Sequence, residues 1–405
     1  MDAKKMEKIF LDTMYVHTSG TKEELEVAKY LQGVCAEYGL EAKLDPFEVD
    51  MATINKAVLL IDGVEYPCKG FFLSGSAEVE APIYCLESND KVSLSQCKGK
   101  IVLVESGLGY WTYQDLLANG AVGFITYNGD IHNEDTEIEQ KELRSYFSNG
   151  NKIPGVSVHA KEVVKIVDSR PTTAKIILEQ DEYKGTSHNV VLDLPGEIDK
   201  LIVFTTHYDT TPLAPGSYDN MSGSVVLLAA AKYFAEHPHR YSMRFIWCGS
   251  EERGLLGSKA YCAAHEEELA NIDLVVNVDM IGCIMGKLNA ICTTEADLPA
   301  YIKYMGRELG VTIGTSQDIY SSDSTPFADK GVPAVSFARG AAGGTGAYHS
   351  RFDTIKVLSM KRMQEDTDFV IKFAERMANS LIFPVERTIP DNIKEKIDKY
   401  LFRKR

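Results

Sequence analysis

The chain has 405 residues, of which 44% are hydrophobic and 25% charged, a composition typical of a soluble globular protein with room for two or three domains. Its 58 acidic residues outnumber its 43 basic residues, giving a formal net charge of -15. This acidic balance argues against a nucleic acid or an anionic membrane as partner.

The opening residues contain no apolar run as long as a secretory leader, and no segment reaches the length of a membrane span. A cytoplasmic location is therefore expected, unless a leader has been trimmed from an exported protein. The eight cysteines include no Cys-x-x-Cys pair. They are expected to be free thiols, whereas a secreted chain would allow disulfides.

The first predicted element is a helix over Thr21–Gly39, where apolar residues recur at helical spacing and Gly39 favours a C-terminal stop. From about residue 48 the pattern changes to short β-type runs separated by turns. One helix, Tyr113–Asn119, lies among them, and the acidic run Glu134–Leu143 is expected to be an exposed loop or short helix. The predicted strands are Ala57–Ile61, Gly70–Leu73, Glu80–Cys85, Ile101–Glu105, Ala121–Tyr127 and Val156–His159.

Strands and helices alternate after residue 186. The predicted strands are Asn189–Leu194, Leu201–Thr206, Met243–Cys248, Leu274–Asp279 and Ala334–Phe337. The predicted helices are Asn220–Ala235, Arg253–Ala264, Leu298–Leu309 and Ser359–Ile382. Such alternation predicts an α/β fold with a mainly parallel sheet covered by helices on both faces.

These patterns divide the chain into a main domain and an insertion. Residues 1–47 and 186–385 form the main α/β domain, and residues 48–185 form a β-rich domain inserted into it. The tail, 386–405, carries apolar residues four apart, a narrow helical stripe. This helix either docks on its own domain or forms a contact in a homodimer.

Several predicted strands of the main domain end in residues that can bind a metal, and ligands gather outside the carboxyl ends of strands in such sheets. His207 and Asp209 follow one strand and share a face, because side chains two apart on a strand point the same way. A carboxylate beside a metal-binding histidine fixes its tautomer. The other candidates are Asp219, Glu251, Glu252, Asp279 and His349.

Two imidazoles and several carboxylates suit a pair of zinc ions, with one carboxylate bridging them. Asp219 is the best bridge candidate because it is central in the series. Of the adjacent Glu251 and Glu252, one is expected to hold metal and the other to act as general base, and the residue types alone leave open which does which. Tyr348, beside His349, is placed to donate to a developing oxyanion.

Five ordered motifs resemble those of the co-catalytic di-zinc aminopeptidase family, whose relatives include glutamate carboxypeptidase, the transferrin-receptor ectodomain and glutaminyl cyclases. The motifs are TTHYD, YDNMSG, SEERGLLGS, NVDMIG and YHSRFDT. The insertion resembles a protease-associated domain through KGKIVLVESG and QDLLANGAVGFITYN. One departure is Ser324, at a position where a histidine is frequent in the family.

The resemblance implies a three-layer sandwich with a mixed, mainly parallel sheet, and two zinc ions. His207 and Asp279 would hold one ion, Glu252 and His349 the other, and Asp219 would bridge them. Asp209 would orient His207, Glu251 would be the general acid/base, and Tyr348 would be the oxyanion donor. The implied reaction is hydrolysis of the N-terminal peptide bond of a peptide substrate.

Other functions of this family compete with that one. A carboxypeptidase or dipeptidase is the main alternative, but the few basic residues near the motifs, Arg253, Arg339 and Arg351, form no clear cluster for a free carboxylate. Glutaminyl cyclases usually lack the inserted domain. A non-catalytic, receptor-like binding protein would have lost metal ligands, whereas all five positions are filled here.

Overall fold

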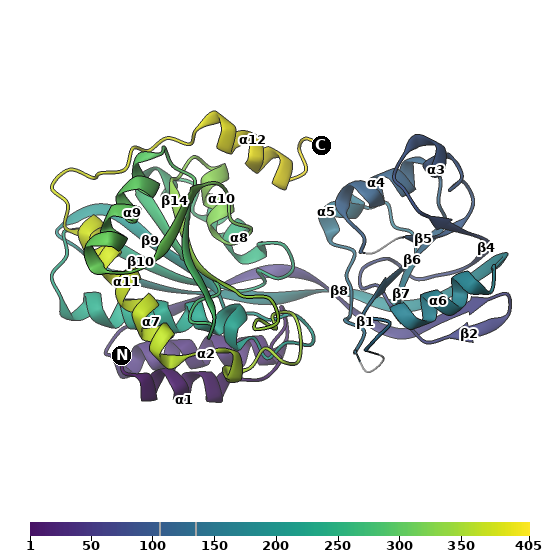
Figure 1. Cartoon of the computed structure of the whole chain (residues 1–405), viewed down its shortest axis with the longest axis horizontal. Helices are drawn as coiled ribbons and strands as arrows, with labels where there is room; N and C mark the ends of the chain where they lie inside the picture. The colour runs from purple at the N-terminus through teal and green to yellow at the C-terminus, as the bar shows by residue number, and fades with distance from the viewer. Residues whose placement is uncertain (105–106, 134–135) are drawn as a thin grey trace. The chain divides into compact units, whose positions relative to one another are not determined.

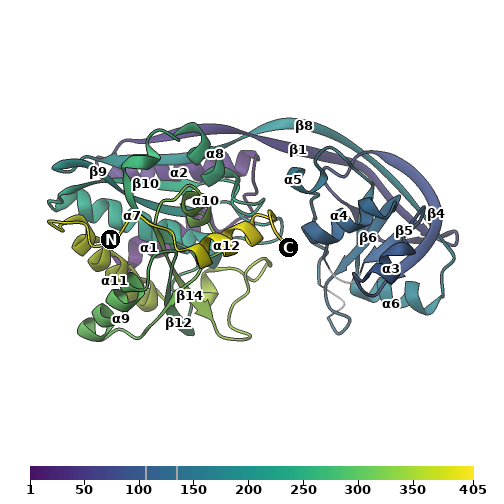
Figure 2. The same ribbon diagram turned by 90° about the horizontal axis from the view of Figure 1, so that it is seen from above.

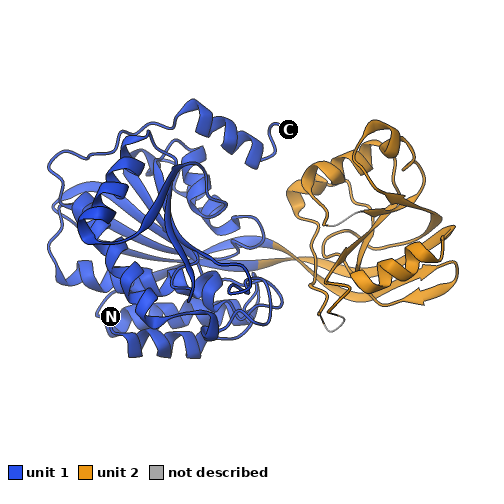
Figure 3. Cartoon of the chain, viewed as in Figure 1, with its two compact units in different colours: residues 1–49, 186–404 blue, residues 50–185, 405 orange. Residues whose placement is uncertain are grey.

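A computed structural model describes residues 1–104, 107–133 and 136–405, which divide into two compact units (Figure 3). Unit 1 comprises Met1–Val49 and Thr186–Lys404, and unit 2 comprises Asp50–Gly185 with Arg405. The predicted insertion, 48–185, differs from unit 2 by two residues at its start. Glu105 and Glu134, which belong to two predicted segments, lie outside the described residues.

Unit 1 is built on a sheet with the strand order β13-β12-β14-β11-β9-β10-β8. Its strands are the part of β8 (Thr173–Leu194) that follows residue 185, β9 (Ile198–His207), β10 (Tyr241–Cys248), β11 (Ile272–Val278), β12 (Gly286–Cys292), β13 (Ile313–Gln317) and β14 (Ala334–Ala341). The neighbours β14, β11, β9 and β10 run parallel, as do β12 and β13, whereas β12 is antiparallel to β14 and β8 to β10. The prediction of a mixed, mainly parallel sheet is therefore confirmed.

Both faces of the central strands are buried, because successive side chains enter two different cores. Phe204 of β9 packs into the larger core, and Val203 packs into the smaller one with Phe327. The helices of the larger core are α1 (Ala3–Thr13), α2 (Lys22–Glu37), α7 (Ser222–Glu236), α9 (Asp297–Leu309) and α11 (Met360–Ala378). The smaller core is covered by α8 (Leu256–Ala264) and α10 (Ser324–Asp329), so unit 1 has three layers (Figure 1).

The C-terminal helix α12 (Asp391–Tyr400) docks on unit 1. Its Ile393 and Ile397 are buried against Ala328 of α10, and both helices lie side by side in Figures 1 and 2. Burial of this stripe accounts for the apolar residues spaced four apart in the tail. Among the described residues, no helix has both the length and the apolarity needed to cross a membrane.

Several elements differ from the sequence prediction. The helix α1 and the strands β12 and β13 were not predicted. The helix α8 starts at Leu256 rather than Arg253, because the backbone N–H groups of Gly254 and Leu255 both donate to the carbonyl of Glu251 and form a tight turn first. The eight cysteines are free, as predicted.

Unit 2 contains a core of parallel strands in the order β4-β5-β6-β7, with β3 antiparallel to β7. Its strands are β2 (Val64–Tyr66), β3 (Cys68–Gly70), β4 (Ala77–Leu86), β5 (Ile101–Val104), β6 (Gly123–Asn128) and β7 (Gly155–His159), and the chain enters along β1 (Ala42–Ile61) and leaves along β8. Its helices are α3 (Lys91–Ser95), α4 (Tyr110–Ala118), α5 (Ser145–Ser148) and α6 (Ala160–Asp168). Strands β1 and β8 are longer than predicted, because polar residues interrupt the apolar pattern along both of them.

Candidate metal centre

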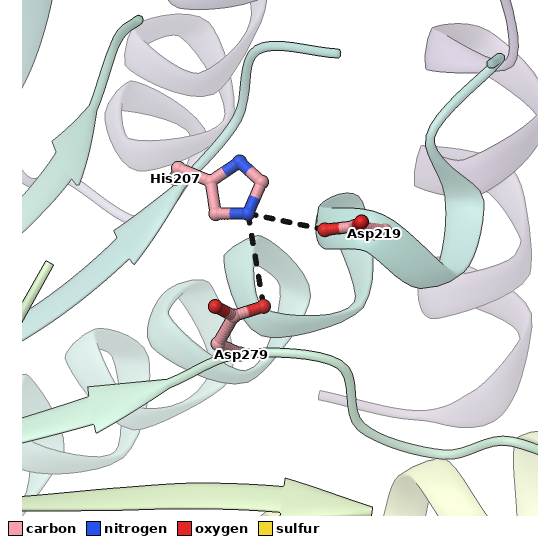
Figure 4. Close-up of side chains that lie close together, drawn as sticks. All are labelled: His207, Asp219 and Asp279. Atoms are coloured by element: carbon pink, nitrogen blue, oxygen red, sulfur yellow. Dashed lines mark ion pairs between the residues drawn. The ribbon is translucent and has the colours of Figure 1, made fainter. Parts of the chain in front are cut away.

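The first group of metal-capable side chains gathers at the carboxyl ends of β9 and β11. His207 is the last residue of β9, and its Nε2 lies 3.2 Å from Oδ1 of Asp219 and 3.7 Å from Oδ1 of Asp279 (Figure 4). The ligand atoms of these three buried residues all lie within 4.8 Å of one another. One imidazole and two carboxylates can therefore face a single ion.

A second group shares Asp219 with the first. The Nε2 atom of His349 lies 3.1 Å from Oδ2 of Asp219 and 3.2 Å from Oε2 of Glu252. The two oxygens of Asp219 thus face different histidines, with Oδ1 toward His207 and Oδ2 toward His349. This is the arrangement required of a bridging carboxylate.

The donor set fits divalent cations. Oδ1 of Asp279 is buried and has no hydrogen-bond partner among the described residues, which is costly unless another species binds it. Burial and the neighbouring carboxylates raise the pKa of Glu251 and of Glu252, so the acids repel one another here. Two divalent cations would remove this repulsion, and imidazole with carboxylate is a ligand set that zinc accepts.

The turn after β10 carries both glutamates. Ser250 adopts a left-handed backbone conformation with φ of 58°, and Glu251 and Glu252 follow it. Glu252 belongs to the second metal group, whereas Glu251 belongs to neither. The Oε2 atom of Glu251 nevertheless lies 3.9 Å from Nε2 of His207, so the carboxylate of Glu251 is close to the first group. A carboxylate in this position is available for proton transfer.

Asp209 contacts both His207 and the turn after β10. Nδ1 of His207 lies 3.2 Å from the backbone carbonyl oxygen of Asp209, and the nearer carboxylate oxygen is 3.6 Å away. The carboxylate also accepts hydrogen bonds from the backbone N–H groups of Glu251, at 2.8 Å, and Glu252, at 3.2 Å. Asp209 therefore connects the histidine with the turn that carries the two glutamates.

Tyr348 lies beside His349, with 5.0 Å between the ring centroids, and its side chain is 55% exposed. This position is next to the second group and open to solvent. A role in stabilising an oxyanion remains a prediction.

Asp353 supports the site and was not predicted. Its buried carboxylate accepts hydrogen bonds from the backbone N–H groups of Tyr218, at 2.7 Å, and Asp219, at 3.0 Å. It holds the backbone of the shared carboxylate in place. Its position four residues after His349 was the only hint of this role in the sequence. The sequence does not indicate its contact with the backbone of Asp219, which lies 134 residues away.

Tyr320 also belongs to the surroundings of the centre. Burial raises the pKa of its phenol, and the carboxylates of Asp279 and Asp219 raise it further. The phenol therefore stays protonated. Tyr320 was not predicted from the sequence.

Comparison with known proteins identifies the family. The model of peptidase family M28 matches residues 189–374, which include all five metal-capable positions and Glu251. Aminopeptidase YwaD of Bacillus subtilis (strain 168) is 30% identical over 319 residues, covering 73% of this chain and 68% of that protein. The chain belongs to peptidase family M28. The predicted membership of the di-zinc aminopeptidase family is thereby confirmed.

Solved structures show the same fold as this M28 peptidase. A zinc aminopeptidase from Bacillus subtilis, BSAP, superposes with a TM-score of 0.78 at 24% identity, covering 97% of this chain and 99% of that one. An aminopeptidase from Aneurinibacillus sp. strain AM-1 gives a TM-score of 0.78 at 23% identity, with 95% and 96% covered. The fold therefore extends over nearly the whole chain, beyond the residues matched by the family model.

Proposed function

We propose that this M28 peptidase removes N-terminal residues from peptides at two zinc ions, with Glu251 as general acid/base. The class of enzyme, a zinc-dependent exopeptidase, follows from the family and from its aminopeptidase relatives. The observation that supports the residue roles best is that two metal-capable groups share Asp219, while Oε2 of Glu251 lies 3.9 Å from Nε2 of His207 without belonging to either group.

In this proposal His207 and Asp279 would hold one ion, Glu252 and His349 would hold the other, and Asp219, which belongs to both groups, would serve both ions. When bound, a pair of zinc ions polarises the substrate carbonyl and makes water acidic enough to be deprotonated near neutral pH. His207 is kept in orientation by the backbone carbonyl of Asp209.

Glu251 accepts the proton of the attacking water and passes it to the leaving amine, which is the task of a general acid/base. Burial raises the pKa of its carboxyl, and this favours a group that can also hold a proton. Asp209 keeps the backbone of Glu251 in place through the 2.8 Å hydrogen bond. Tyr348 is proposed to donate to the carbonyl oxygen as negative charge develops on it.

The contacts of the arginines favour an aminopeptidase over a carboxypeptidase. The buried guanidinium of Arg339 pairs with Asp366, with Nε donating to Oδ2 at 2.7 Å and Nη2 to Oδ1 at 2.5 Å. Arg339 is therefore taken up and cannot also hold the free carboxylate of a peptide. Arg253 contacts Ser19, and Arg351 lies over an aromatic ring at 5.0 Å. The acidic centre favours a substrate ammonium instead.

One pentapeptide in three forms tests this choice: free, N-acetylated and C-amidated. Acetylation is expected to abolish cleavage, because it removes the ammonium that the acidic site favours. Amidation is expected to change the rate little. Cleavage of the acetylated peptide but not of the amidated one would show a carboxypeptidase and contradict the proposal.

Unit 2 is proposed to be a protease-associated domain, on the strength of the two sequence motifs and of its parallel strands β4 to β7.

A further inference from the structure

The N-terminal segment 17–24 contacts both loops that carry the candidate site, although the family match begins only at residue 189. The backbone N–H of His17 donates to Oγ1 of Thr210 at 3.0 Å, and the N–H of Thr210 donates to the carbonyl of His17 at 3.3 Å. Oγ of Ser19 lies 2.5 Å from Oγ of Ser250. The segment thus touches the loop after β9 and the turn after β10.

Glu24 is the acidic residue at the centre of these contacts. Its side chain, on the first turn of α2, is only 1% exposed. Oε1 accepts hydrogen bonds from the hydroxyls of Ser187, at 2.7 Å, and Ser250, at 3.4 Å, and Oε2 accepts one from the N–H of Gly20 at 2.6 Å. Acidic side chains are rarely buried unless they have partners, and the three donors satisfy this carboxyl.

The turn after β10, which carries Glu251 and Glu252, packs directly against the carboxyl of Glu24. A Cβ atom at Gly249 would lie 2.9 Å from Oε1 of Glu24 and 2.6 Å from Oγ of Ser187, so glycine is required for the close approach. Ser250, the next residue, holds a left-handed conformation that a side chain rarely adopts. Such a conformation persists only when its surroundings hold it, and the surroundings here are Glu24 and Ser19.

We propose that Glu24 is a positioning residue of the active site: it fixes the turn at Gly249 and Ser250 so that Glu251 presents its carboxylate to the metal centre. The proposal rests on the proposed role of Glu251. Asp209 also holds this turn, because its carboxylate accepts hydrogen bonds from the N–H groups of Glu251 and Glu252. Because rate depends steeply on the placement of the proton acceptor, a small displacement of the turn lowers kcat.

The test compares Glu24→Ala and Glu24→Gln by kcat, KM, zinc content and Tm. Glu24→Ala is expected to lower kcat by at least about tenfold, with two zinc ions retained and KM little changed. Burial and Asp209 raise the pKa of Glu24 to about 8, so glutamine resembles its neutral form in shape and in hydrogen bonding. Glu24→Gln is therefore expected to recover most of the wild-type kcat.

Val27→Ala is the matched control, because Val27 is fully buried on the same helix and packs in the apolar core. It should lower Tm and leave kcat unchanged. Wild-type kcat in Glu24→Ala, or an equal loss of kcat in Val27→Ala, would overturn the proposal. If Glu24→Ala does not fold, Ser19→Ala replaces it; a lower kcat with zinc retained supports the proposal, and an unchanged kcat contradicts it.

Glu251→Gln is assayed in parallel to separate this proposal from the one on which it rests. If Glu251→Gln is inactive and Glu24→Ala is fully active, the positioning role fails and the general base stands. If Glu251→Gln is nearly fully active, the general base itself is wrong, and positioning by Glu24 falls with it.

Discussion

Replacing Glu251 with glutamine is expected to lower kcat by at least about a hundredfold while both zinc ions stay bound, since general base catalysis contributes at least that much. The carboxylate lies 3.9 Å from His207 but belongs to neither metal group. Glutamine keeps the size of the side chain and the backbone hydrogen bond to Asp209. It removes only the ability to take up and return a proton.

The measurement combines steady-state kinetics with the zinc content of the purified variant. Glu308→Gln is a suitable control, because Glu308 lies on α9, pairs with Arg376 at the surface and belongs to neither metal group. It should behave like the wild type. Near-normal turnover of Glu251→Gln with two zinc ions bound would rule out Glu251 as the base.

Asp219→Asn is expected to lose more metal than Asp209→Asn. The two oxygens of Asp219 face His207 at 3.2 Å and His349 at 3.1 Å, so the substitution weakens both proposed metal sites at once. The carboxylate of Asp209 faces backbone N–H groups instead. Its replacement acts indirectly, and losses of about 10- to 100-fold in metal affinity or activity are usual for such residues.

Zinc content and kcat of the two variants decide between direct and indirect roles. Asp219→Asn should lose zinc and activity together, whereas Asp209→Asn should keep more zinc while its kcat falls, because an amide has one acceptor oxygen and can keep only one of the two hydrogen bonds to the turn that carries Glu251. Equal retention of zinc by the two variants would count against Asp219 as the bridge.

The sequence predicted the metal-capable residues because they follow strands whose carboxyl ends meet at one edge of a parallel sheet. His207 ends β9, and Asp279 follows β11. Because these strands are parallel neighbours, the topology of the sheet alone is enough to bring the two residues together. The direction of each carboxylate was not predictable in this way. The carboxylate of Asp209 turns to the backbone of Glu251, a contact between residues 42 apart that depends on the shape of the turn after β10.

The supporting residues were harder to predict for the same reason. Asp353 and Glu24 act through backbone and hydroxyl groups far away in the chain, and such contacts leave no periodic pattern. Strands β12 and β13 lie toward one edge of the sheet, where Gly286–Cys292 and Ile313–Gln317 bury fewer side chains than the central strands. Their weak apolar pattern explains why they were not predicted.

Anomalous scattering at the zinc absorption edge, from crystals of the zinc-loaded wild-type protein, tests the two-metal site most directly. The structure predicts two peaks about 3.5–4 Å apart, the usual spacing in two-metal sites, with Asp219 between them. One peak should lie beside His207 and Asp279, and the other beside Glu252 and His349. A single peak, or a second peak away from Asp219, would contradict the shared carboxylate on which the proposed mechanism depends.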